Sequence, residues 1–583
     1  MNSQKQENLL NLALTVTAEE RRNSLELDVG VLEGTRWELI IKYHGDFPEK
    51  IQSLEEQYNT DFQVEYLLPG YAILTVEEAY LDRVTALTEV DYVEKPKALY
   101  EDAITISQAN VTSCVAEVTQ GIPNLTGNGV LIGIPDSGID YSDSIFLNTS
   151  LKTRIAYLWD QTSLLDGKNP EGFYEGAEFS GEELDRSLDK NAELSFDRSG
   201  HGTAVADICA GSGAAYESEL LIVKLGSGNP QGFTRTTELM RAISWMIQKA
   251  VLLERPLVIN ISYGSTYGSH DGTSLLETFL DAAADVYKTV ICVGSGNEGA
   301  AAGHVETVVD IPREIEWSVA PFQPSLNVSI WKNYVDNFGL TIVSPKGERI
   351  TGFQNTSGYE TYEIEQTKVL VYIGEPSPYS QVQEYYLEFQ ETETQNGIAA
   401  GIWKIFIEPI RVVDGYCHLY LPAATVLTEG TNFFRPSPET TLTIPATAQK
   451  VITVGAYDSV YEEYADFSGR GYEQTDDRRL ASWQSNVQKP DLVAPGVSIL
   501  ARDGRGGTTI VSGTSFATPF VTAAAALLME WGIVRGNDPF LYGEKMKAYL
   551  RKGARPIRGE SLYPNEKIGY GALCLAASMP DIT

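Results

Sequence analysis

Cysteine is scarce in this chain, with five in 583 residues. They stand at Cys114, Cys209, Cys292, Cys417 and Cys574, odd in number, far apart and mostly among apolar neighbours. Such spacing does not match the closely spaced cysteines of a disulfide framework or of a zinc site. We therefore expect reduced, buried thiols and no metal centre.

Basic residues and long apolar runs are also lacking. The 44 Lys and Arg residues against 79 Asp and Glu residues give a net charge of −35, which opposes non-specific binding to nucleic acid or to anionic membranes. No apolar run is expected to span a membrane, and the leucines of "MNSQKQENLLNLALTVTAEERR" are too interrupted for a secretion signal. We expect a soluble acidic protein made in the cytoplasm, with neither nucleic acid nor membrane as partner.

The length favours two to four domains. Short runs in residues 35–100 alternate between strand and helix patterns ("WELIIKYHG", "KIQSLEEQY", "GYAILTVEEAYLDRVTALTEVDYVEKP"), which predicts strand, helix, strand, helix, strand. This pattern is typical of a small α+β domain, which we place at residues 1–104.

From about residue 128 the pattern changes. The continuous apolar strands "GVLIGIPD", "LLIVKLG", "PLVINISYG" and "TVICVGSG" alternate with helical segments, which predicts a doubly wound, mostly parallel sheet covered on both faces. Between about 308 and 438 only short strand patterns occur, which predicts an inserted all-β sandwich or jelly roll. The α/β domain is therefore expected in two parts, 105–308 and 439–583, around an insert at 309–438.

Ser515, in "VSGTSFATPFVTAAAALL", stands where a buried helix is expected to begin. A serine at that place is commonly a helix cap. The alternative is a nucleophile, which requires a base, a group that orients the base, and donors for an oxyanion.

Three other segments offer those partners. Asp136 ends an apolar strand, His201 stands between glycines in "SGHGTAVADICAG", and Asn297 follows another apolar strand in "GSGNEG". Each one alone reads as an ordinary turn, loop or cap residue. Together with Ser515 they supply all four roles of acyl-transfer chemistry.

These four motifs, in this order, resemble those of the subtilisin-like serine proteases. The resemblance implies that Ser515 attacks the scissile carbonyl, His201 transfers the proton, Asp136 orients His201, and Asn297 stabilises the oxyanion, without a cofactor. It also implies a pocket for the side chain before the cleaved bond (the P1 residue), which is flanked by two segments: Ser262, Tyr263 and Gly264; Gly294, Ser295 and Gly296.

The 218 positions from Asn297 to Ser515 exceed what that family needs, and the inserted β domain accounts for the excess. An insert there and an N-terminal prodomain resemble the Csp proteases of clostridial spores. The resemblance implies a prodomain that the enzyme itself cuts, here between about Tyr100 and Ala109, and that can stay bound as an inhibitor. It implies further that the substrate is the precursor of a spore cortex hydrolase, and that the protein is associated with spores of a Gram-positive bacterium.

The chain also departs from the family pattern. Ala204 replaces the second histidine of "HGTH", Pro135 precedes Asp136, and the short segment between Gly202 and Val223 lacks a calcium loop, so we expect no calcium there. Some Csp relatives are pseudoproteases that bind a partner or sense a ligand, and this alternative stays open, as does a general bacterial peptidase of other physiology. A ligand-binding role for the β insert is a further alternative to simple packing.

Overall fold

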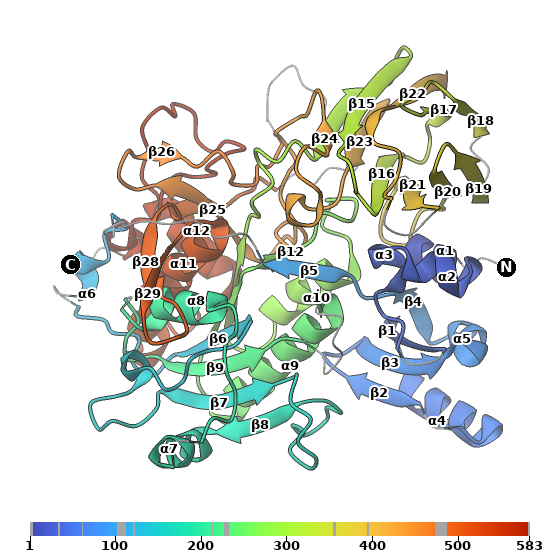
Figure 1. Ribbon diagram of the computed structural model, residues 1–583. Coiled ribbons are helices and arrows are strands. Elements are labelled where there is room, and N and C mark those ends of the chain that lie inside the picture. The colour runs from blue at the N-terminus through green and yellow to red at the C-terminus, as the bar shows by residue number, and fades with distance from the viewer. Residues whose placement is uncertain are drawn as a thin grey trace.

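The computed structural model describes residues 4–32, 35–60, 62–101, 112–119, 123–190, 192–212, 214–226, 233–353, 357–392, 396–472 and 487–580. Figure 1 shows an α/β core with an N-terminal α+β unit to one side and a β domain above that unit. The expected fold class is therefore confirmed.

The N-terminal unit is built on a four-stranded antiparallel sheet in the order β2-β3-β1-β4. Its strands are β1 (Arg36–Tyr43), β2 (Gln63–Tyr66), β3 (Tyr71–Glu77) and β4 (Val90–Glu94), with helices α4 (Phe47–Tyr58) and α5 (Glu78–Thr85) between them. Three short helices precede them: α1 (Asn8–Thr15), α2 (Ala18–Arg22) and α3 (Leu25–Asp28). The predicted order of strands and helices is confirmed, whereas β2 and the three short helices were missed.

The central sheet runs in the order β26-β25-β13-β11-β6-β9-β7-β8, with β27 also paired to β25. Its strands are β6 (Leu131–Asp136), β7 (Ile155–Asp160), β8 (Ala177–Ser180), β9 (Glu219–Lys224), β11 (Leu257–Ile261), β13 (Thr289–Gly294), β25 (Ile452–Asp458), β26 (Glu463–Tyr464) and β27 (Leu492–Pro495). The helices of this part are α6 (Ala116–Thr119), α7 (Gly181–Asp189), α8 (His201–Ala210), α9 (Thr236–Leu252), α10 (Leu275–Ala284), α11 (Thr514–Met529), α12 (Gly543–Gly553) and α13 (Leu575–Ser578). A hairpin of β28 (Ile499–Arg502) and β29 (Thr508–Val511) leads into α11.

Both faces of the central sheet are buried, which explains its continuously apolar strands. Successive residues of a strand point to opposite faces. Thus Leu131 packs in one cluster with α9 and α10, whereas Ile132 packs in another with α8 and α11. The parallel pairs of β6 with β9 and β11, and of β11 with β13, place the carboxyl ends of these strands at one edge.

The inserted domain is a sandwich of two antiparallel sheets. One contains β14 (His304–Val308), β23 (Tyr416–Tyr420), β16 (Ser325–Asn333), β21 (Val382–Glu391), β20 (Thr367–Ile373) and β19 (Gly358–Ile364). The other contains β18 (Arg349–Phe353), β17 (Asn337–Val343), β22 (Gly401–Arg411), β15 (Arg313–Val319) and β24 (Asn432–Phe433). The first sheet begins at His304, just before the boundary expected at 308, and the domain limits themselves stay a prediction.

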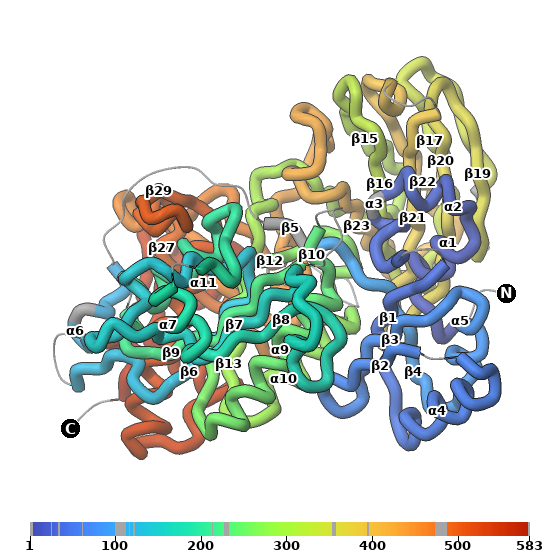
Figure 2. The backbone as a smooth tube through the Cα atoms, turned by 60° about the horizontal axis from the view of Figure 1, so that its bottom comes forward, coloured from blue at the N-terminus to red at the C-terminus, as the bar shows by residue number. Residues whose placement is uncertain are grey.

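The N-terminal unit packs against both other parts of the molecule. In Figure 2 its helices α1, α2 and α3 lie against strands β19, β20 and β21 of the insert. Leu370, Tyr372 and Tyr386 of the insert belong to the same buried cluster as Leu10 and Trp37 of the N-terminal unit. The core of this unit is therefore completed by the β insert.

The cysteines correct one expectation. Cys114 and Cys574 form a disulfide across a sequence separation of 460 residues, with their Cα atoms 4.8 Å apart. The other three, Cys209, Cys292 and Cys417, are free and buried, as expected. Spacing along the chain cannot predict a bond between a segment near residue 114 and the last helix, because only the fold brings them together.

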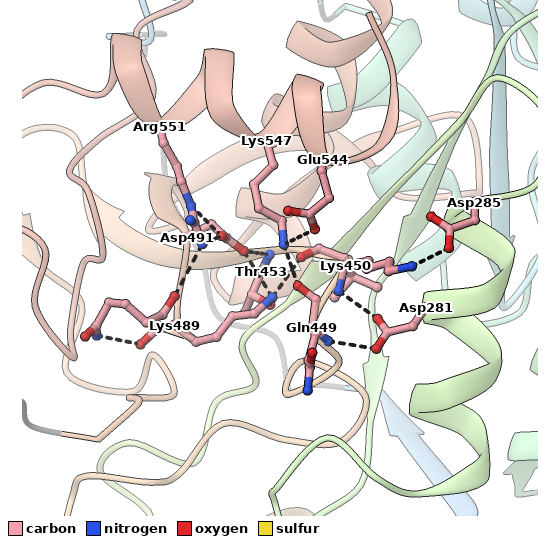
Figure 3. A network of polar contacts seen from close by, with 12 residues as sticks. Asp281, Asp285, Gln449, Lys450, Thr453, Lys489, Asp491, Glu544, Lys547 and Arg551 are labelled. Carbon is pink, nitrogen blue, oxygen red and sulfur yellow. Dashed lines mark hydrogen bonds and ion pairs between the residues drawn. The ribbon is translucent and has the colours of Figure 1, made fainter. Parts of the chain in front are cut away.

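A buried polar network holds α12 against β25 and β27 (Figure 3). The carboxylate of Asp491 accepts hydrogen bonds from the Thr453 backbone N–H (2.7 Å), from Lys489 Nζ (3.1 Å) and from Arg551 Nε (2.8 Å). Helix α11, which carries Ser515, packs on the same two strands. The network therefore helps to hold the strands that support this helix.

One helical segment among the described residues, Thr514–Val534, is long and apolar enough to cross a membrane, with a mean hydropathy of 1.5 over its best window. This differs from the expectation that no run reaches that length. However, 83% of the window is buried inside the fold, so a core helix explains its composition.

Candidate active site

Asp136 is the last residue of β6, at the carboxyl edge of the central sheet. Its Oδ1 accepts a hydrogen bond from the backbone N–H of Ser137 (2.7 Å), and its backbone carbonyl accepts from Leu225 (2.7 Å). The side chain is 1% exposed. The end of strand β6 thus holds the carboxylate in place, and the sequence pattern had predicted Asp136 at a strand end.

His201 begins α8 and meets this carboxylate. Its Nδ1 lies 2.7 Å from Asp136 Oδ1, and the histidine is 1% exposed. The glycine of "HGT" is required here, because a Cβ at Gly202 would lie 2.2 Å from the Gly138 carbonyl oxygen and 3.0 Å from Asp136 Cβ. Ala204, where the family has a second histidine, is a buried part of the same helix.

Asp197 fixes the start of α8, a role that the sequence analysis missed. Its Oδ1 accepts from the Gly200 N–H (3.0 Å), and its Oδ2 accepts from the N–H (2.9 Å) and the hydroxyl (2.8 Å) of Thr203. An acidic residue just before a helix was the available signal. Asp197 therefore positions His201 through the helix terminus.

Ser515 is the second residue of α11, and the capping interpretation of this serine is wrong. The N-cap is Gly513, and the first N–H of the helix, that of Thr514, donates to Asn297 Oδ1 (3.0 Å). Ser515 Oγ instead donates to the backbone carbonyl of Ser262 (3.3 Å). Its hydroxyl is therefore not committed to the helix end.

Asn297 links the end of β13 to α11. Because its Oδ1 accepts from both the N–H and the hydroxyl of Thr514, its Nδ2 is the donor that remains. This nitrogen lies 3.3 Å from the point where a Cβ on Gly513 would stand, beside the N-terminus of the helix. A side-chain donor and a helix N-terminus thus converge next to Ser515.

The ring of His201 also approaches α11. Its centroid lies 5.2 Å from that of Phe516, the residue after Ser515, and 6.1 Å from that of Tyr263. Helices α8 and α11 pack against each other. The structure thus brings Asp136, His201, Asn297 and Ser515 to one region from four separate elements.

The six predicted pocket residues fall into two groups. Gly264 and Gly296 both face Thr443, whose side chain lies between them; Thr443 was missed because no pattern marks it. The other four residues contact other parts of the site. Gly294 lies against Thr514 and Thr518 of α11, and Ser295 Oγ contacts Ser468 Oγ (3.2 Å). Ser262 Oγ donates to the Ser515 carbonyl (3.0 Å), and Tyr263 is buried beside His201.

The segment after β4 enters this site. Strand β5 (Ala98–Glu101) pairs antiparallel with both β10 (Thr234–Arg235) and β12 (Tyr263–Gly264), and Figure 1 shows it extending from the N-terminal unit into the α/β core. Tyr263 is opposite Glu101, and Gly264 is opposite Tyr100. The chain therefore occupies the groove as an added strand that runs toward Ser262 and Ser515.

Two glutamates of the N-terminal unit lie at helix N-termini of the core. Glu38 contacts Arg241 (3.0 Å) and Arg235 (3.4 Å) at the start of α9, and Glu94 Oε2 accepts from the Leu275 N–H (3.1 Å) at the start of α10. Burial raises the pKa of Glu38, but its attraction to Arg235 and Arg241 outweighs burial and lowers that pKa to about 2. These contacts place negative charge where helix dipoles favour it.

Among the described residues, no group of three or more His, Cys, Asp or Glu side chains could hold a metal ion. The expected absence of a calcium site between Gly202 and Val223 stays a prediction. The predicted cleavage segment between Tyr100 and Ala109 lies, from residue 102 onward, outside the described residues.

The comparisons with known proteins agree with this architecture. A family model described as the Csp protease B prodomain matches residues 4–97, and one described as the subtilase family matches residues 127–327 and 426–571. The solved structure of the Clostridium perfringens CspB protease is 34% identical with a TM-score of 0.72, and the match covers 80% of this chain and 95% of that one. The subtilase match is interrupted where the β insert lies.

Curated relatives match over shorter regions. Serine protease AprX of Bacillus subtilis (strain 168) is 30% identical over 160 residues, which are 24% of this chain and 32% of AprX. The subtilase-type proteinase RRT12 of Saccharomyces cerevisiae is 40% identical over 91 residues, 15% of each chain. The matched region thus spans about a third or less of these relatives.

Proposed function

Because this chain belongs to the subtilase family of serine proteases and begins with a Csp-type prodomain, we propose that it hydrolyses peptide bonds with Ser515 as its nucleophile. The observation that carries the proposal is the 2.7 Å contact between His201 Nδ1 and Asp136 Oδ1 near the start of α11. This contact holds the proton on Nδ1, so Nε2 presents the lone pair that accepts a proton from Ser515.

The reaction proceeds through an acyl-enzyme. Ser515 Oγ attacks the carbonyl carbon, His201 takes its proton and gives it to the leaving amine, and water then releases the acyl group by the reverse roles. The contact of Ser515 Oγ with the Ser262 carbonyl is long for a hydroxyl hydrogen bond, 3.3 Å, so the hydroxyl turns to His201 at little cost. Asn297 Nδ2 and the N-terminus of α11 stabilise the oxyanion.

We propose further that the protease cuts its own prodomain. Strand β5 supports this, because it already pairs with both walls of the groove as an extended substrate does. The described register ends with Glu101 opposite Tyr263, which follows Ser262, the residue whose carbonyl contacts Ser515. The cut then falls shortly after Glu101, within the predicted segment.

The test is expression of Ser515→Ala. This variant should accumulate as the intact chain, whereas the wild type and Ser512→Ala, a control three residues upstream, should be processed. Sequencing of the mature N-terminus identifies the bond. Normal processing of Ser515→Ala would show that another protease makes the cut.

A pseudoprotease remains the competing function. A small fluorophosphonate reacts only with an activated serine, so labelling of the wild type at Ser515 and its loss in His201→Ala support the protease. An unlabelled wild type would favour the binding role.

The proposed physiological substrate is the precursor of a spore cortex hydrolase, and the proposed location is the spore of a Gram-positive bacterium. The Csp-type prodomain and the likeness to the CspB protease support this. Incubation of the processed protein with such a precursor should yield one new N-terminus, absent with Ser515→Ala. If the precursor stays intact while the protein cleaves other peptides, a general peptidase is the better description.

The cut prodomain is proposed to stay bound. Its Glu38 and Glu65 form ion pairs with Arg241, and all three side chains are buried. Separation would break these buried ion pairs and would expose the apolar cluster that the prodomain shares with the insert. Co-elution of both fragments in size-exclusion chromatography at neutral pH is the expected result.

A further inference from the structure

A cavity of about 70 Å³ lies where the N-terminal unit, the α/β core and the β insert meet. The N-terminal unit contributes Tyr92 and Lys97 to its lining, the core contributes Tyr267, and the insert contributes Trp331 and Glu384. One water molecule needs about 10–15 Å³ of such space, so the cavity has room for a small molecule. The residues assigned to the active site above do not line it.

Two buried polar atoms of this lining have no hydrogen-bond partner among the described residues: Glu384 Oε1 and Trp331 Nε1. Trp331 of β16 is directly opposite Glu384 of β21, so the two side chains are neighbours on one face of the sheet. Glu384 is 1% exposed, and its other oxygen accepts from the Tyr267 hydroxyl (3.0 Å). A buried acceptor and a buried donor thus lack partners at the same place, and a bound molecule would supply both.

The partner that Glu384 lacks is a cation. Lys97, the basic residue of the lining, already contacts the carboxylates of Glu7 (2.9 Å) and Glu94. Burial and the nearby charge of Glu7 raise the pKa of Glu384 to about 8, which the Tyr267 hydroxyl and Lys97 offset only in part. An ammonium group beside this carboxyl group would favour its charged form.

The other walls fit an organic ammonium ion with a polar group. The rings of Tyr267 and Trp331 lie 6.4 Å apart, edge to face, and Tyr92 also lines the cavity. Aromatic faces attract organic cations. Trp331 Nε1 can only donate, so it requires an acceptor on the ligand. The described lining contains four glutamates and one lysine, which disfavours a carboxylate as that acceptor and favours a hydroxyl group.

We propose that this cavity binds a small amino alcohol, with its ammonium group on Glu384 Oε1 and its hydroxyl group on Trp331 Nε1. Such a ligand contacts all three parts of the molecule, so it also stabilises their association, as any ligand does that binds only the assembled state. The inference goes beyond the proposed protease function and does not depend on it, because no active-site residue takes part.

The test is calorimetric titration of ethanolamine into the purified full-length protein with Ser515→Ala, in which no peptide cleavage contributes heat. For a ligand of four non-hydrogen atoms the expected Kd is roughly 0.1–1 mM. Propylamine, in which a methyl group replaces the hydroxyl group, should bind about 3–10-fold more weakly, because it loses one neutral hydrogen bond. Ethylene glycol lacks the ammonium group, and glycine carries a carboxylate, so neither should give a heat of binding at the same concentrations.

Three variants of this protein locate the site. Glu384→Gln keeps an acceptor for the Tyr267 hydroxyl but removes the charge, so the affinity for ethanolamine should fall at least about tenfold. Glu388→Gln, on the same face of β21 but outside the lining, is the matched control and should bind as the Ser515→Ala parent does. Trp331→Phe keeps an aromatic wall without the donor, so it should weaken ethanolamine about 3–10-fold and leave propylamine unchanged. An unchanged Tm of each variant without ligand shows that the fold is kept.

Three outcomes would overturn the inference. No heat of binding with ethanolamine would show that the cavity holds water alone. Binding that neither Glu384→Gln nor Trp331→Phe weakens would place the ligand elsewhere, and equal affinities for ethanolamine and glycine would exclude the proposed ligand class. Each outcome is distinguishable from failure of the protease function, which labelling of Ser515 in the wild type tests separately.

Discussion

Ser262 and Ser515 exchange two hydrogen bonds across the groove: Ser262 Oγ donates to the Ser515 carbonyl (3.0 Å), and Ser515 Oγ donates to the Ser262 carbonyl (3.3 Å). Ser262 Oγ in turn accepts from Asn260 Nδ2 (2.9 Å), whose Oδ1 accepts from Thr522 of α11 (3.0 Å). A buried polar chain therefore joins the groove strand to the helix that carries the nucleophile.

Ser262→Ala should lower kcat/KM on a peptide substrate by about tenfold. The variant leaves the Asn260 amide and the Ser515 carbonyl without their hydrogen-bond partner, Ser262 Oγ. A buried polar group that loses its partner costs about 1–3 kcal/mol of folding free energy. Ser265→Ala, three residues further along, is the control and should keep near wild-type kcat/KM, because its hydroxyl accepts from the Tyr267 N–H and does not belong to the polar chain that reaches Ser515. Equal losses in both variants would mean that the polar chain has no special role in positioning Ser515.

Asn297 has two functions that two substitutions separate. Asn297→Asp keeps an oxygen that accepts from the Thr514 N–H but removes the Nδ2 donor, whereas Asn297→Ala removes both. Both should lose about 10²–10³ in kcat, which is the loss known for the corresponding oxyanion donor of subtilisin. Only Asn297→Ala should also lose about 1 kcal/mol of stability, as for a missing helix cap. Steady-state kinetics and urea unfolding provide the two measurements, and full activity of Asn297→Asp would exclude the oxyanion role.

Much of the site could be predicted because its residues stand at element ends. Asp136 and Asn297 follow apolar strands, and His201 and Ser515 begin helices, so parallel topology alone brings such positions to one edge. Thr443 could not be found in this way. It becomes relevant only because the fold lays its segment between Gly264 and Gly296, and nothing in "TLTIPATAQ" indicates that contact.

Contacts over long sequence distances explain the other misses. The disulfide of Cys114 and Cys574 joins segments that no local pattern relates. The docking of α1–α3 on the insert was not foreseen either, because the polar β21 positions that meet this helical segment, Glu388 and Gln390, resemble solvent-facing residues in the sequence. Their burial is visible only when both surfaces are placed together.

The association of prodomain and insert should weaken as the pH rises. Burial raises the pKa of Glu388 to about 8, and Glu26 of α3 adds to the negative charge facing it. Separation of the prodomain would return the pKa of Glu388 to about 4.3. Because the folded pKa is the higher one, this stabilisation is complete below about pH 4.3 and is lost as the pH rises through 8.

Prodomain retention in the processed complex, measured by size-exclusion chromatography at fixed protein concentration, should therefore decrease between pH 5 and pH 8.5. Glu388→Gln cannot ionise and should flatten the profile. Glu363→Gln, on an exposed position of β19, is the matched control and should follow the wild type. Retention that is independent of pH in the wild type would show that this carboxyl group does not control the association.

Asp491 should be the most costly single carboxylate to remove from the network of Figure 3. Burial raises the pKa of Asp491, but the nearby charges of Lys489, Lys547 and Arg551 outweigh burial and lower it to about 2, below the usual value of about 3.9. The stabilisation by the Asp491 carboxylate is present above about pH 4 and is lost as the pH falls through 2.

Asp491→Asn leaves buried cations unbalanced, so the free energy of unfolding measured in urea at pH 7 should fall by about 3–5 kcal/mol. Asp285→Asn is the control, since its carboxylate is 62% exposed and pairs with Lys450 at the surface, and it should change stability by less than about 1 kcal/mol. Similar losses in both variants would contradict a special role for the buried carboxylate.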